Sequence, residues 1–163
     1  MWAFNWELPS SVQTYHTKRN KLDTITTLEA VLFWPDGRRA TLDVSAECPH
    51  RSQFEICTSS HTIKVDDLVG GQGRSGDFSA YFVPYVGSSQ YVLGDAAGKD
   101  EVVRVEACDH VALKVRDLAK CVLAIKAGGA PDPEWPKRSI ATHTVMCAIF
   151  ESSEKGGAVI SLS

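Results

Sequence analysis

The spacing of apolar side chains changes once along this chain, and that change sets the fold class. Up to about residue 107, apolar and polar residues alternate, as in residues 39–46, which is the period of a half-buried strand. From about residue 109, apolar residues recur at steps of three and four, as in a helix that lies on a core. Strands first and helices last predict an α+β fold, with a mostly antiparallel open sheet and the helices packed on one face.

Two hairpins are predicted in the strand-forming half. The first joins residues 25–34 to residues 39–46 through Pro35-Asp-Gly, where Pro presets φ and Gly accepts a positive φ. The second joins residues 52–57 to residues 62–66. In residues 39–46 the alternation predicts the apolar face of a half-buried strand, formed by Ala40, Leu42, Val44 and Ala46. In residues 25–34, Leu28, Ala30, Leu32 and Trp34 share a face, and Val31 and Phe33 make the other face apolar too, so coverage on both sides is also open for this strand.

The rest of this half is less uniform. Residues 11–17 are expected to form an edge strand, and residues 101–107 form another alternating strand. Residues 70–78 are a Gly-rich loop, and residues 79–93 are rich in aromatic side chains but interrupted by Pro84 and Gly87.

Two helices are predicted after residue 108. The first spans residues 109–126, with Asp109 as its N-cap and a Gly-Gly pair at 128–129 as its stop. A rigid, Pro-rich loop follows at residues 130–136, and Ser139 is expected to cap the second helix, which runs to about Ser153. Its core-facing residues are Ala141, Val145, Ala148, Ile149 and Ser152. Residues 158–162 are expected to form a short closing strand.

The composition excludes several classes of protein. A net charge of −3 over 163 residues, spread evenly along the chain, leaves no basic surface for nucleic acid. No apolar run reaches the ~18 residues of a membrane span, and residues 1–7 lack the pattern of a secretory signal. Five cysteines without a C-x-x-C pair are expected to be reduced thiols in a cytoplasmic protein: Cys48, Cys57, Cys108, Cys121 and Cys147.

Two motifs could bind a ligand, and for both the structural interpretation is favoured. Residues 71–76 match G-x-G-x-x-G, but a dinucleotide loop needs a strand before it and a helix after it, and an aromatic, Pro-stopped stretch follows here. A zinc site could use Cys48, His50, Cys57 and His61, yet their spacing differs from that of known zinc motifs. We expect instead that Cys57 packs inward and that His61 lies in a turn.

No catalytic constellation stands out. His110 and His143 are expected to be structural, and the carboxylates of residues 66–67, Asp132 and Glu134 are expected to be solvated. A group of aromatic residues could line a substrate pocket, but covering the sheet and loops is the favoured role. The group comprises Trp34, Trp135, Tyr81, Phe82, Tyr85 and Tyr91.

Several segments, in order, resemble the C-terminal domain of the Gfo/Idh/MocA oxidoreductases, nearest the branch of dihydrodiol and xylose dehydrogenases. The resemblance covers nearly the whole chain. Its segments are Glu7-Leu-Pro-Ser-Ser-Val-Gln13, residues 36–45 (Asp-Gly-Arg-Arg-Ala-Thr-Leu-Asp-Val-Ser), residues 55–65, and residues 127–157, which begin Ala-Gly-Gly-Ala-Pro-Asp-Pro-Glu-Trp-Pro. Thr58 and His61 depart from it, because the family's second hairpin turns on glycines there, and the loop at 70–94 matches nothing in the family.

The resemblance implies an NAD(P)-dependent oxidoreductase that acts on a sugar or diol. In that family an N-terminal Rossmann domain binds the cofactor, a Glu-Lys-Pro motif holds the catalytic Lys, and an Asp-x-Gly-x-Tyr/His motif supplies further active-site groups. Neither motif occurs in this sequence, and the domain's first strand is also expected to be missing. We therefore expect residues 1–163 to form one domain without catalytic, cofactor-binding or metal-binding residues. NAD(P) is implied for the complete enzyme, and this chain alone is expected to be inactive.

The resemblance also implies a partner. A lost strand leaves an exposed sheet edge, which favours a homo-oligomer, or pairing with a full-length paralogue, through the open sheet face. A stand-alone, non-enzymatic module that oligomerises or binds a partner is the alternative. A metal-dependent enzyme built on the Cys/His group is a third hypothesis, which the ligand spacing disfavours.

Overall fold

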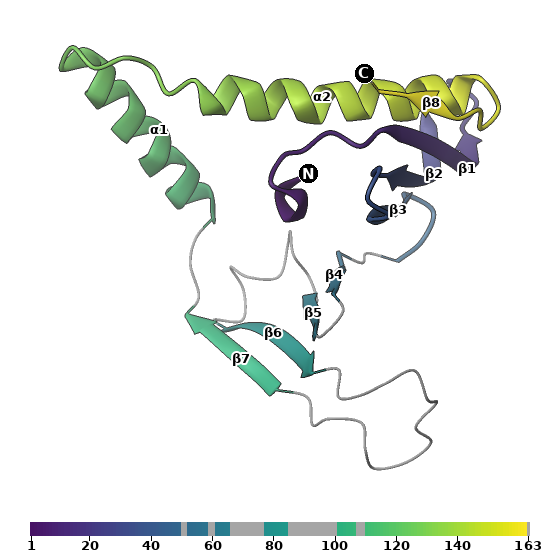
Figure 1. Cartoon of the computed structure of the whole chain (residues 1–163), viewed down its shortest axis with the longest axis horizontal. Helices are drawn as coiled ribbons and strands as arrows, with labels where there is room; N and C mark the ends of the chain where they lie inside the picture. Colours follow the sequence, from purple (N-terminus) through teal and green to yellow (C-terminus); the bar gives the residue numbers. More distant parts are fainter. Residues whose placement is uncertain (50–51, 59–60, 66–76, 85–100, 107–109, 163) are drawn as a thin grey trace. The chain divides into compact units, whose positions relative to one another are not determined.

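The computed structural model describes residues 1–49, 52–58, 61–65, 77–84, 101–106 and 110–162 (Figure 1). The chain divides into two compact units, one formed by Met1–Pro49 with Asp132–Ser163 and the other by His50–Pro131. Within the described residues, all strand pairings are antiparallel and two long helices follow most of the strands, which confirms the α+β class. That residues 1–163 form a single domain stays a prediction.

The first unit is built on a four-stranded sheet with the order β3-β2-β1-β8. Its strands are β1 (Ser11–Arg19), β2 (Ile25–Phe33), β3 (Arg39–Ser45) and β8 (Ile160–Ser161). The predicted first hairpin is confirmed: the N–H of Trp34 donates to Arg38 O, and Gly37 has a φ of +88°. The expectation that residues 11–17 form an edge is wrong at their start, because β8 returns to pair with Ser11 and Val12.

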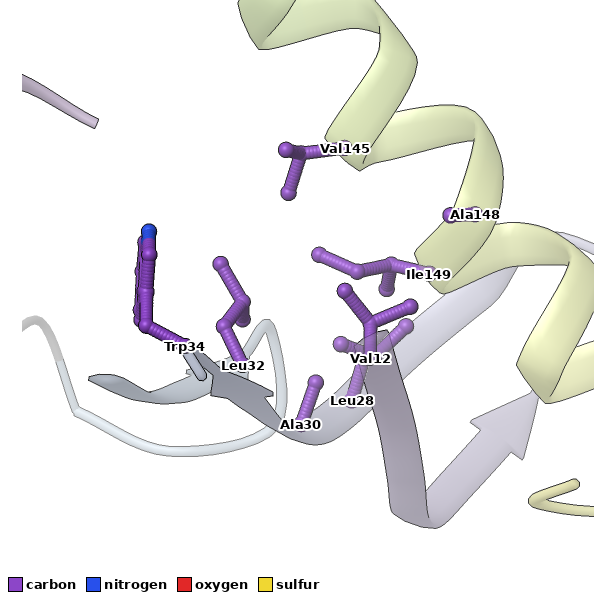
Figure 2. Close-up of a cluster of buried hydrophobic side chains, with 8 residues drawn as sticks. All are labelled: Val12, Leu28, Ala30, Leu32, Trp34, Val145, Ala148 and Ile149. Atoms are coloured by element: carbon purple, nitrogen blue, oxygen red, sulfur yellow. The ribbon is translucent and has the colours of Figure 1, made fainter. Parts of the chain in front are cut away.

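The core of this unit lies between the sheet and α2 (Glu134–Glu154), and Figure 2 shows the two sets of side chains facing each other. Of the five α2 residues predicted to face inward, Val145, Ala148, Ile149 and Ser152 are buried and Ala141 is half-buried. The sheet contributes a matching set that the alternation largely predicted: Val12, Leu28, Ala30, Leu32 and Trp34.

The inward face predicted for β3 is wrong in part. Leu42 is 42% exposed and Val44 is 61% exposed, although their partners Ala30 and Leu28 on β2 are buried. In this unit α2 contacts β1 and β8, so the sheet is covered on that side while β3 stays open. The alternation therefore predicted correctly that Leu42 and Val44 lie on the same face of the sheet as Ala30 and Leu28. It could not predict that α2 covers only part of this face.

The start of α2 also differs from the prediction. The helix begins at Glu134, five residues before Ser139, and includes part of the segment expected to be a rigid loop. A proline in the first turn costs little, since the N–H groups there have no acceptor in the helix. Pro136 is therefore tolerated, and the carboxylate of Asp132 accepts a 2.9 Å hydrogen bond from the N–H of Glu134.

The hydrogen bond of Asp132 at the start of α2 gives a direct stability prediction. Replacing Asp132→Ala should lower the free energy of unfolding of the first unit by about 1 kcal/mol, the usual net contribution of one hydrogen bond. All four Trp residues lie in this unit, so Trp fluorescence during urea unfolding reports on it. Asp132→Asn keeps the acceptor oxygen and should lose less than half as much, and equal losses in the two variants would contradict a contribution from this hydrogen bond.

The second unit contains the sheet β4-β5-β6-β7. Its strands are β4 (Phe54–Cys57), β5 (His61–Val65), β6 (Asp77–Pro84) and β7 (Glu101–Glu106). The second hairpin and the strand at residues 101–107 are thus confirmed. The described strands form two four-stranded antiparallel sheets, one in each unit. The Gly-rich segment 70–76 and residues 85–93 lie outside the described residues.

The helix predicted at residues 109–126 is confirmed as α1 (His110–Lys126). Its predicted apolar face is exposed, with Val115 at 62% and Leu118 at 65%. Periodicity shows which side chains share a helix face, but not whether another element covers that face. The expected N-cap, Asp109, lies outside the described residues.

Candidate functional site

Two grooves in the first unit run along opposite flanks of α2. The β8 groove has a volume of ≈ 660 Å³, and the β3 groove has a volume of ≈ 510 Å³. The β8 groove is lined by Ser139, Ile140, His143, Thr144, Cys147, Ala148, Glu151, Ile160, Ser161 and Leu162. The β3 groove is lined by Ile25, Thr26, Thr27, Leu28, Leu42, Val44, Ser45, Ala46, Met146, Ile149 and Phe150.

The β8 groove is lined by the ionisable and nucleophilic side chains His143, Cys147 and Glu151. His143, Cys147 and Glu151 follow one another at steps of four along α2, which places them on one helix face. Glu151 forms a 2.6 Å ion pair with Lys155. His143 lies within α2, as expected, and is exposed, and its structural role stays a prediction. Over the described ranges, no three His, Cys, Asp or Glu side chains are arranged to hold a metal ion.

The β3 groove is largely apolar. Leu42, Val44, Met146 and Phe150 line it and are each more than 40% exposed. Its hydroxyl groups are partly engaged, since those of Thr27 and Ser45 lie 2.9 Å apart. Such a surface can bind apolar or amphipathic groups, but it offers no acid–base pair for a reaction.

A buried hydroxyl fixes α2 against the sheet between these grooves. Ser152 Oγ is fully buried, accepts a 2.9 Å hydrogen bond from the N–H of Thr14, and donates a 2.6 Å bond to Ala158 O. Its oxygen also lies 3.1 Å from Thr14 Oγ1. The sequence placed Ser152 on the core face. Its role as a hydrogen-bond centre was missed, although a polar residue on an apolar face was a usable signal.

A charged cluster at the first hairpin is structural. Phe4 stacks on Trp34 with ring centroids 4.0 Å apart, and the Arg38 guanidinium lies 5.4 Å from the Phe4 ring. Arg38 pairs with both Glu7 and Asp36 at 2.6 Å. The backbone N–H of Arg38 is the main group that lowers the pKa of Asp36, and the hydrogen bond that the Arg38 guanidinium donates to Glu7 is the main cause that raises the pKa of Arg38. The structural role favoured for Trp34 is confirmed.

The structure does not bring together the residues considered for a zinc site, a nucleotide loop or an aromatic pocket, as far as it describes them. Cys48 and Cys57 are exposed, so the expectation that Cys57 packs inward is wrong: the alternation of β4 half-buries Phe54 and Ile56 instead. Trp135 is also exposed, at 53%. The expectation that His61 lies in a turn is wrong, because it is the first residue of β5 and pairs with Pro84 of β6. Its side chain is not described, and the other candidates likewise have no described side chain or lie outside the described residues: His50, Asp66, Asp67, the glycines of 71–76, Tyr81, Phe82, Tyr85, Tyr91 and His110.

Comparison with known proteins supports the fold. No protein-family model matches the sequence. Among solved structures, a proposed NADPH-dependent oxidoreductase from Desulfitobacterium hafniense superimposes with a TM-score of 0.64 and 18% sequence identity. The match covers 94% of this chain but only 42% of that protein. At this identity the match shows a shared fold, and the chain spans less than half the length of the protein that it resembles.

Neither α1 nor α2, the two long helices of the described part, is long and apolar enough to cross a bilayer.

Proposed function

We propose that this chain is the C-terminal, substrate-binding and oligomerisation part of an NAD(P)-dependent oxidoreductase of the Gfo/Idh/MocA type. The observation that carries this proposal is the asymmetric coverage, since nearly all of this chain matches less than half of a protein named for NADPH-dependent oxidation or reduction. A nicotinamide performs the hydride transfer itself, and the protein binds and orients the two reactants. In this proposal, the cofactor and the proton-transfer residues belong to a further domain.

The proposed substrate is a sugar or a diol, as in the dihydrodiol and xylose dehydrogenases that the sequence resembles. In the oxidative direction, the carbinol carbon gives a hydride to the nicotinamide and the hydroxyl gives its proton to a base. The contribution of this chain is a folded surface that limits which substrate fits. We place the complete enzyme in the cytoplasm, in keeping with the free thiols of the four described cysteines.

The proposed partner is a second copy or a full-length paralogue. The open face of the first sheet carries Gln13, Val31 and Thr41 side by side, as the strand register shows. These residues alternate with the buried Val12, Ala30 and Leu32, so they project from the face opposite to α2. This mixed surface is the one proposed for pairing in the complete enzyme.

The test is cofactor binding by the isolated chain. We expect no change in NADPH fluorescence and no heat of binding with NADP⁺ or NAD⁺, because the cofactor site lies on another domain. No sugar or diol should be oxidised by the chain with either cofactor. NADPH binding in the micromolar range, or turnover above a buffer control, would contradict the proposal that this chain lacks the cofactor domain.

A further inference from the structure

We draw no further inference here: the strongest candidate, the largely apolar β3 groove between α2 and β3, with Met146 and Phe150 on one side and Leu42 and Val44 on the other, carries nothing, because nothing in the described structure shows what covers it.

Discussion

Replacing Gly157→Ala is expected to lower the free energy of unfolding of the first unit by about 2–4 kcal/mol. Gly157 has a φ of +88°, a conformation that costs any L-residue free energy, and a Cβ built there would lie 2.6 Å from Thr14 O. That oxygen belongs to the backbone of β1, which is held by pairing with β2, so it cannot move aside cheaply. Urea unfolding followed by Trp fluorescence measures the loss.

Gly37 provides the matched control for this substitution. Its φ is also +88°, but a Cβ at that position would meet nothing within 4 Å. Gly37→Ala should therefore show only the conformational cost of about 1 kcal/mol. Equal losses at the two positions would show that the close approach of Gly157 to β1 contributes nothing to stability.

The second large effect is expected for Ser152→Ala, which removes the hydroxyl that joins α2, β1 and the chain at Ala158. The N–H of Thr14 and the carbonyl of Ala158 would lose the partners that they have in the native protein. Thr14 is buried, so leaving its N–H unpaired costs about 1–3 kcal/mol, whereas Ala158 is exposed and its carbonyl can bond to water, so a loss of about 1–3 kcal/mol is expected. The same unfolding measurement applies.

The neighbouring Ser153 is the control. Its Oγ is buried and has no hydrogen-bond partner among the residues that the structure describes, so Ser153→Ala should change stability by less than about 0.5 kcal/mol or increase it slightly. A loss at Ser153 as large as that at Ser152 would mean that the hydrogen bonds of Ser152 are not the source of its effect. Ser152→Cys, which keeps a weak donor and acceptor, should fall between the two.

The elements with regular patterns were predictable from the sequence. The first hairpin followed from the alternation in β2 and β3 and from Pro35-Asp-Gly, because both the strand period and the turn residues are local properties. The buried face of α2 followed from its period in the same way. The helix start was missed because a proline usually ends a helix, whereas Pro136 lies in the one turn that tolerates it.

Features that depend on long-range packing were not predictable in this way. The exposure of Val44 depends on which part of the sheet α2 covers, and no local pattern contains that information. The steps from His143 to Cys147 and Glu151 are visible in the sequence, but the β8 groove exists only because a strand from the chain end lies beside them. The hydrogen bonds of Ser152 likewise join residues far apart in sequence.

The central claim is that this chain supplies the substrate side of an oxidoreductase whose cofactor is bound elsewhere. The most direct measurement is the mass and activity of the native protein, captured from source cells with an antibody to residues 127–138. We predict a polypeptide larger than 17.8 kDa by about one domain, with NAD(P)-dependent oxidation of a sugar or diol. A 17.8 kDa polypeptide that carries no NAD(P)-dependent activity would contradict the claim.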